Sequence, residues 1–283
     1  MRYGAVFPTA DARSALEIRD LAQAYEDAGF DYVALAGHLL STRPGRYAGR
    51  PDYQYVGPFF DPFVLFSYLA SITSRIHFLS QVLILPLRET AAVARQAAEL
   101  AFLSNDRFEL GVGISWQEAE YVAAGQDVHE RGARLAEQVE LLRLYWSQPL
   151  VTFKGRFHEV DEMGLGRLPK NPIPIWFGSQ FGEAAMRRAA ALGDGWMPIG
   201  GSTDALPRFK EYALEAGRDP NSIMLMGSVA VGKEGPDALV AEAKRLQGLG
   251  ITHVTVTSAP GLTSDSAVKE VIDAGRILKA AVP

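Results

Sequence analysis

A histidine just after a short apolar segment is the first residue of this sequence that could carry out chemistry. The segment Asp31-Tyr32-Val33-Ala34-Leu35 has the length and composition of a buried strand, and His38 follows it closely. Histidine titrates near neutral pH, so it can transfer a proton or orient a carbonyl group. A loop histidine that bonds only to backbone groups is the alternative. We hypothesise that His38 is catalytic.

A second segment, Phe108-Glu109-Leu110-Gly111-Val112-Gly113, ends an apolar strand in two glycines. Because glycine has no side chain, the backbone at Gly111 and Gly113 can be approached closely by a ligand. Ligands of parallel α/β folds bind at this carboxyl end of the strands. Acidic residues follow at Glu118 and Glu120, where we expect them to cap the start of a helix.

Anion binding is suggested by the segment Ile175-Trp176-Phe177-Gly178-Ser179-Gln180-Phe181-Gly182-Glu183, which runs from a strand through a turn into a helix. The free N–H groups and the dipole at a helix start attract phosphate. An ordinary strand-to-helix turn is equally compatible with this pattern. Arg131 and Arg134 begin another helix and either reach a ligand phosphate or face solvent.

Three aromatic residues, Trp116, Trp176 and Phe177, come at the ends of predicted strands and could stack on a planar cofactor. Trp176 could equally fill the core of a barrel.

Composition excludes several classes of protein. The 283 residues contain no cysteine, which rules out disulfides, thiolate nucleophiles and cysteine-ligated metal sites. A net charge of −5 argues against nucleic acid or an anionic membrane as the main partner. The five histidines are scattered, so we expect no metal site. The start of the chain is broken by Pro8 and does not resemble a signal peptide, and no apolar run could span a membrane, so we expect a cytoplasmic protein.

Helical segments alternate with short apolar strands along the whole chain, which indicates βαβ units and a parallel sheet. We predict eight strands, starting near Arg2, Asp31, Ile76, Arg107, Ile173, Gly195, Ile223 and Ile251. We predict helices at residues 14–28, 62–74, 89–104, 130–146, 182–192, 206–216, 237–249 and 264–280. Eight such units in this length favour a TIM (β/α)8 barrel over a doubly wound sheet, and we expect residues 1–283 to form one domain.

Three connections are longer than ordinary loops, at residues 37–61, 115–129 and 147–172. The first two follow strands at the carboxyl face and should form the walls of an active site. The third contains residues 151–160, which we predict to be a small β-hairpin turning at Lys154-Gly155.

Several segments, taken in order, resemble the bacterial luciferase-like family of flavin-dependent and coenzyme F420-dependent enzymes. They are Arg75-Ile76-His77-Phe78-Leu79-Ser80-Gln81-Val82-Leu83-Ile84-Leu85-Pro86-Leu87-Arg88, then Arg107-Phe108-Glu109-Leu110-Gly111-Val112-Gly113, His129-Glu130-Arg131-Gly132, Pro174-Ile175-Trp176-Phe177-Gly178 and Gly193-Asp194-Gly195-Trp196. The sequence is most similar to the probable F420-dependent oxidoreductases of this family.

The resemblance implies a luciferase-like TIM barrel in which the cofactor ring lies against the third strand. The family has a bulge and a non-prolyl cis peptide there, matching Gln81-Val82. The resemblance places the cofactor phosphate at Ser179, Gln180, Phe181 and Gly182, and it places His38 near the reactive face of the ring. From the position of the glycine-ended strand beside this ring site, we expect Gly111 and Gly113 to make room for the cofactor, and we expect Trp116 and Asp61 to line the substrate pocket. The resemblance also implies a homodimer.

The expected activity is hydride transfer between deazaflavin F420 and a small organic substrate. Deazaflavin enzymes of the family often have an acidic residue before the histidine, where this chain has Gly37, so FMN remains an alternative cofactor. An FMN-dependent monooxygenase is therefore the second hypothesis. A non-catalytic flavin-binding relative and a barrel hydrolase are more distant ones.

Overall fold

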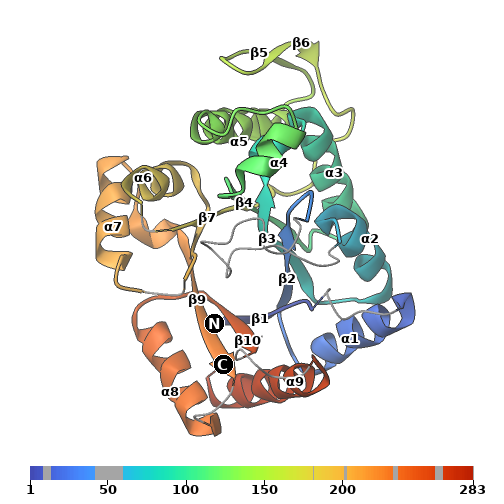
Figure 1. Cartoon of the computed structure of the whole chain (residues 1–283), viewed down its shortest axis with the longest axis vertical. Coiled ribbons are helices and arrows are strands. Elements are labelled where there is room, and N and C mark those ends of the chain that lie inside the picture. The colour runs from blue at the N-terminus through green and yellow to red at the C-terminus, as the bar shows by residue number, and fades with distance from the viewer. Residues whose placement is uncertain are drawn as a thin grey trace.

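The structure is a computed structural model that describes residues 1–8, 14–41, 60–180, 182–200, 203–231, 235–258 and 264–282. Parallel strands form a closed barrel at its centre, and helices surround them (Figure 1). Around the barrel the strands follow the order β1, β10, β9, β8, β7, β4, β3 and β2. The predicted TIM barrel is confirmed.

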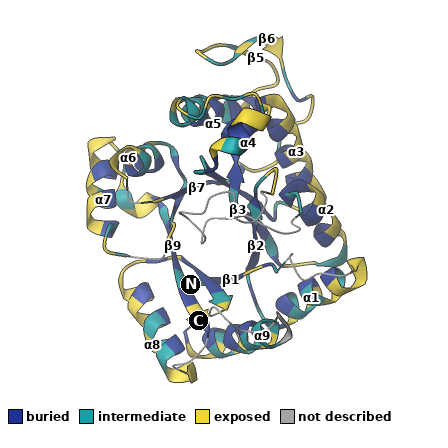
Figure 2. Cartoon of the chain, viewed as in Figure 1, coloured by how far each residue is buried: buried dark blue, intermediate teal, exposed yellow. Residues whose placement is uncertain are grey.

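Each predicted barrel strand is present within a few residues of its expected start. The strands are β1 (Arg2–Val6), β2 (Tyr32–Gly37), β3 (His77–Ile84), β4 (Phe108–Gly113), β7 (Ile175–Ser179), β8 (Gly195–Pro198), β9 (Met224–Val231) and β10 (His253–Ser258). They are buried, whereas the outer faces of the helices are exposed (Figure 2). The positions of the barrel strands can therefore be predicted from the periodicity of the apolar residues.

The expected helices also form. They are α1 (Ala15–Asp27), α2 (Pro62–Ile72), α3 (Thr90–Leu103), α5 (Arg131–Ser147), α6 (Glu183–Leu192), α7 (Leu206–Glu215), α8 (Gly235–Gly248) and α9 (Ser264–Ala281), with short 3-10 turns η2 (Leu85–Leu87) and η3 (Pro220–Ser222). Local chemistry sets several of their ends. Ser14 caps α1 by accepting from the Glu17 amide at 3.2 Å, and Asp61 caps α2.

A further helix, α4 (Glu118–Ala123), lies in the long connection after β4 and begins at Glu118, where the sequence predicted the start of a helix. It has only six residues and no side-chain cap at its start. Such a short helix is not stable alone, so tertiary contacts must hold it. Its inner residues, Glu120 and Tyr121, are buried.

The predicted hairpin is confirmed as β5 (Val151–Lys154) and β6 (Glu159–Met163), which project beyond α5 (Figure 1). Its turn closes through the Gly155 amide, which donates to the His158 carbonyl at 2.9 Å. Glu137 on α5 accepts from the backbone amides of Arg156 and Phe157 at 2.7 and 2.8 Å. This carboxylate anchors the hairpin to the barrel.

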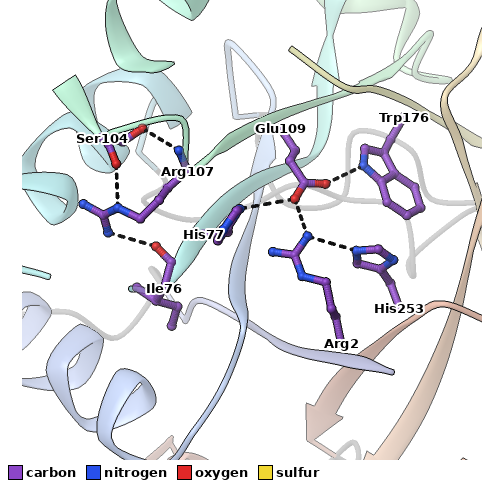
Figure 3. A network of polar contacts seen from close by, with 8 residues as sticks. All are labelled: Arg2, Ile76, His77, Ser104, Arg107, Glu109, Trp176 and His253. Carbon is purple, nitrogen blue, oxygen red and sulfur yellow. Dashed lines mark hydrogen bonds and ion pairs between the residues drawn. The ribbon is translucent and has the colours of Figure 1, made fainter. Parts of the chain in front are cut away.

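A polar cluster closes the amino-terminal end of the barrel (Figure 3). Glu109 accepts from Arg2 Nη1 at 2.6 Å and from Trp176 Nε1 at 2.8 Å, and His77 Nδ1 lies 3.4 Å from it. Burial alone would raise the pKa of Glu109, but the contacts with His77, Arg2 and His253 lower it to about 2. This end of a TIM barrel generally serves stability rather than catalysis.

Within this cluster His253 is neutral and has a defined tautomer. Arg2 Nη1 lies 3.2 Å from His253 Nε2, and arginine can only donate, so Nε2 is the acceptor. The other ring nitrogen, Nδ1, then donates to Thr252 Oγ1 at 2.9 Å. Burial lowers the pKa of His253 to about 4. His77 and His253 thus serve the structure of the barrel base.

Candidate active site

A cavity of about 370 Å3 lies at the carboxyl ends of the barrel strands. Six strands line it (β1, β2, β3, β8, β9 and β10), and most of its surface is apolar. Its walls include Ala34, Ala36, Gln81, Val82, Met197 and Met226. Ligands of TIM barrels bind at this face, so the cavity is the first candidate for a cofactor or substrate site.

Strand β3 departs from regular geometry where it reaches this cavity. Its pairing with β4 shifts register between Leu79 and Leu83, and the Gln81-Val82 peptide bond is cis. Both features expected at this strand are therefore present. The side chain of Gln81 is half-buried, its buried Oε1 has no hydrogen-bond partner, and its Nε2 lies 3.6 Å from Met226 Sδ. An unpaired amide oxygen at a cavity wall is a ready acceptor for a ligand N–H.

The glycines at the end of β4 make room for protein rather than for a ligand. A Cβ at Gly111 would lie 1.8 Å from the Ser80 carbonyl oxygen, and a Cβ at Gly113 would lie 2.5 Å from Val82 Cγ2. Gly178 on β7 is similar, since its Cβ would lie 2.4 Å from Val82 Cγ1. The prediction that Gly111 and Gly113 leave space for the cofactor is therefore corrected: they accommodate the bulge of β3, which in turn shapes the cavity.

His38 is held by a buried carboxylate on the additional helix. Its Nδ1 lies 2.7 Å from Glu120 Oε2. The other oxygen of Glu120 accepts from the backbone amides of Leu39 and Leu40 at 2.9 and 3.1 Å. Glu120 thus fixes both the histidine ring and the chain that follows it. The pair stands just beyond β2, which lines the cavity.

Electrostatics keeps Glu120 ionised. Burial on its own would raise the pKa of this carboxyl group, but hydrogen bonds from His38, Leu39 and Leu40 outweigh burial and lower the pKa. An ionised carboxylate can only accept, so the proton of the shared hydrogen bond is on His38 Nδ1. Proton exchange with a substrate would then use Nε2.

Glu120 is the functional candidate that sequence reasoning missed, because it was interpreted as a helix cap. Instead its side chain is buried beneath α4, while the neighbouring Glu118 is exposed. The only local signal was the spacing of the two residues, which places them on different faces of one short helix. Its partner His38 lies 82 residues away, so the contact is visible only in the folded chain.

The predicted phosphate turn follows β7 and leads into α6. Ser179 is buried and its Oγ already accepts from Trp196 Nε1 at 2.9 Å. Gln180 is exposed, and Phe181 lies outside the described residues. Gly182 begins α6 without a side-chain cap, and a Cβ there would meet no atom within 4 Å. The open side of this helix start is compatible with an anion.

The remaining predicted residues lie as follows. Asp61 caps α2 through Oδ1, which accepts from the Phe63 amide at 2.9 Å, and its Oδ2 accepts from Arg88 Nη1 at 2.6 Å. Its observed partners are thus protein groups, and substrate contact stays a prediction. Trp116 is half-buried beyond β4. The idea that Trp176 and Phe177 stack on a cofactor is wrong, since both are buried within the protein core.

Two general findings concern the described part of the chain. No group of three or more histidine, aspartate or glutamate side chains is arranged to hold a metal ion there. None of the described helices is both long enough and apolar enough to cross a membrane.

Comparison with known proteins agrees with this geometry. A family model described as luciferase-like monooxygenase matches residues 1–270. The chain belongs to this luciferase-like family. This model and those relatives that carry a functional name describe oxidoreductases, and the protein is an oxidoreductase of the luciferase-like type.

Two luciferase-like relatives are particularly similar in sequence. The uncharacterized protein Rv0940c of Mycobacterium tuberculosis (strain ATCC 25618 / H37Rv) is 34% identical over 247 residues, which cover 83% of each chain. An F420-dependent glucose-6-phosphate dehydrogenase of Nakamurella multipartita is 33% identical over 211 residues, which cover 71% of this chain and 59% of that one. F420-dependent oxidoreductases are thus close relatives within the luciferase-like family.

A solved structure shares the luciferase-like barrel over the full chain. An F420-dependent secondary alcohol dehydrogenase in complex with an F420-acetone adduct superimposes with a TM-score of 0.79, covering 100% of this chain and 98% of that one. Since the two sequences are only 19% identical, this likeness supports the fold alone.

Proposed function

We propose that this protein is an F420-dependent oxidoreductase that transfers hydride between the deazaflavin and a small organic substrate. The observation that carries the proposal is the His38–Glu120 pair, 2.7 Å apart, in which His38 follows Ala36 of the cavity wall by two residues. Relatives named as F420-dependent dehydrogenases, at about 30% identity, support the choice of cofactor.

The cavity suits a flavin-like ring. Its apolar walls match a planar heterocycle, and the unpaired Oε1 of Gln81 offers an acceptor for a ring N–H. Gln81 and Val82 would hold the ring, and the open start of α6 near Gly182 would receive the phosphate. When bound, the deazaflavin would supply the carbon that donates or accepts the hydride.

The carboxylate of Glu120 substitutes for the acidic residue that deazaflavin relatives often carry before the histidine. A side chain at Gly37 would be obstructed, because its Cβ would lie 2.9 Å from Leu83 Cδ1 and 3.1 Å from Pro62 Cγ. The carboxylate therefore comes from α4 instead. Gly37, the residue for which FMN was kept as an alternative cofactor, is thus compatible with deazaflavin chemistry.

Each member of the pair has a separate role. His38 would give or take a proton at Nε2 as the substrate carbonyl and alcohol interconvert. Glu120 would hold the ring in one tautomer and stabilise the imidazolium that forms when Nε2 takes a proton. Neither role requires another catalytic side chain.

A titration with purified cofactors tests the proposal. The protein should quench or shift the fluorescence of F420 on binding, and H38A should bind F420 while losing turnover. Tight binding of FMN with no affinity for F420 would overturn the assignment. E118Q, on the exposed face of α4, is the matched control for effects of helix α4.

The second candidate is an FMN-dependent monooxygenase, which the description of the matching family model favours. It predicts oxygen consumption when the protein is supplied with reduced FMN. The absence of oxygen uptake alongside F420-linked turnover would eliminate it.

We further propose that the protein acts as a homodimer in the cytoplasm. Size-exclusion chromatography with light scattering tests the dimer, since a mass of one chain at micromolar concentration contradicts it. Fractionation of the source cells tests the location.

A further inference from the structure

Two arginines come near each other where α5 begins, since the guanidinium of Arg188 on α6 lies against Gly132, the residue after Arg131. A Cβ at Gly132 would lie 2.4 Å from Arg188 Nη2, so the missing side chain lets Arg188 extend across the first turn of α5. Arg131 immediately precedes this glycine. The two helices are neighbours on the outside of the barrel (Figure 1). We call Arg131 and Arg188 the arginine pair.

No acidic side chain among the described residues neutralises the arginine pair. Burial and the positive charge of Arg131 lower the pKa of Arg188. Arg131 donates to the Val128 carbonyl oxygen, and its buried Nε has no partner. The carboxylates at the starts of the two helices have other partners, as Glu130 pairs with Arg156 and Glu183 pairs with Arg187.

Two like charges held together without a counter-charge oppose folding. Their presence therefore points to a ligand that supplies the missing negative charge. Guanidinium groups bind carboxylate and phosphate through paired hydrogen bonds. The first turn of α5 adds partial positive charge of the same sign. The arginine pair therefore has the chemistry of an anion site.

The arginine pair also lies close to the proposed cofactor. Burial raises the pKa of Tyr121, and the positive charge of Arg131 acts in the opposite direction, so Arg131 interacts electrostatically with this tyrosine. Tyr121 packs in one apolar cluster with Ile84 and with Val82, which lines the cavity. Arg188 follows the open helix start at Gly182 by six residues, roughly 9 Å along the axis of α6. If a ligand phosphate bound at this helix start, the ligand groups that follow the phosphate could extend toward Arg188.

We propose that the arginine pair binds the carboxylates that follow the phosphate in the side chain of coenzyme F420. The inference rests on the proposed function and deepens it. F420 continues beyond its phosphate into a chain of carboxylates, whereas FMN ends at its phosphate. The pair thus selects the deazaflavin by its acidic chain and not by its ring.

Binding measured on the full-length protein tests this inference without turnover. Fluorescence titrations would compare F420 with its full acidic chain, F420 truncated after the phosphate, and FMN. R188A should weaken full-chain F420 roughly tenfold, as expected for a lost charged hydrogen bond, and R188K should recover part of the loss. Affinity for truncated F420 should stay within about twofold of the wild type, since the inference assigns its phosphate to the start of α6 and not to the pair.

R187A is the matched control, because Arg187 is on the same helix but is paired with Glu183 and Glu215. It should leave all affinities unchanged. Binding of full-chain F420 should weaken with salt, and less steeply in R188A than in the wild type. Thermal unfolding of R188A and of R131K confirms that the variants are folded.

The possible results separate this inference from the proposed function. Equal weakening of full-chain and truncated F420 by R188A would assign the pair to the phosphate and overturn the inference. Unchanged affinity for full-chain F420 in R188A and R131K would overturn it as well. Wild-type protein that binds neither form of F420 would reject the proposed function and the inference together.

Discussion

The imidazole Nδ1 of His38 and the carboxylate Oε2 of Glu120 lie 2.7 Å apart, although the two residues are separated by 82 positions in the chain. This contact joins the loop after β2 to helix α4, which is too short to be stable alone. It orients the histidine that we assign to proton transfer. Consequences of this contact and of three other arrangements can be measured.

Replacing Glu120 should impair proton transfer more than binding. In E120Q the amide can still accept from Leu39 and Leu40 but no longer matches the N–H of His38, so kcat should fall about tenfold to a hundredfold with KM little changed. The pH profile of kcat should shift as well, which a merely structural change would not produce. Steady-state kinetics on E120Q and E118Q checks this, and equal losses in both variants would contradict it.

The cluster at the base of the barrel should make the protein sensitive to acid. The folded pKa of His253 is about 4 against an ordinary value of 6.5, so the unfolded chain binds its proton first and stability falls as pH drops from 6.5 to 4. At pH 5 this corresponds to a loss of about 2 kcal/mol. The lowered pKa of Glu109, about 2 against an ordinary 4.5, extends the loss to lower pH, because its stabilisation is present above 4.5 and disappears as pH falls toward 2.

Urea unfolding at pH 7 and pH 5 measures this effect. Wild-type protein should lose more stability between the two values than H253Q, which cannot titrate at this position. The idea fails if both proteins lose the same amount.

Packing between Gly113 and Val82 should be testable by a compensating pair of substitutions. G113A places a methyl group 2.5 Å from Val82 Cγ2, so it should destabilise the protein by about 1–3 kcal/mol and weaken cofactor binding. The double variant V82A/G113A should recover much of the stability because the clash is removed. No side-chain substitution should restore the stability of G111A in this way, since the obstructing atom is the backbone oxygen of Ser80. Unfolding midpoints of the four proteins provide the comparison.

Asp61 should reveal whether it supports the fold or contacts substrate. D61N keeps a good helix cap but loses the ion pair with Arg88, whereas D61A loses both. D61A should therefore be less stable than D61N by about 1 kcal/mol. A change of KM in D61N without any change in stability would instead favour the predicted substrate contact.

The periodicity of the chain was enough to predict the barrel because its signals are local. Apolar runs such as that of β4, and helix stops such as Gly29 and Gly250, which adopt positive φ, depend only on nearby residues. The hairpin could be predicted for the same reason. Of helix α4 only the start, at Glu118, could be predicted, since its stability comes from partners distant in sequence.

The candidate site was only partly visible in the sequence. His38 could be nominated from its place after a strand, and the resemblance located the cis bond at Gln81-Val82. The prediction that Gly111 and Gly113 leave space for the cofactor was wrong, because glycine in a sequence does not reveal whether a ligand or another strand fills the space beside it. The burial of Trp176 and Phe177 depends on which face of a closed barrel each residue occupies.

The sequence by itself determined the alternation of strands and helices, the family, and the face of the barrel at which we expect chemistry. These follow from local side-chain patterns and from the parallel direction of the strands. Only the tertiary structure decided that Glu120 bonds to His38 and that Arg188 lies against Gly132, next to Arg131. Contacts of this kind depend on how elements distant in the chain pack together, which no local pattern specifies.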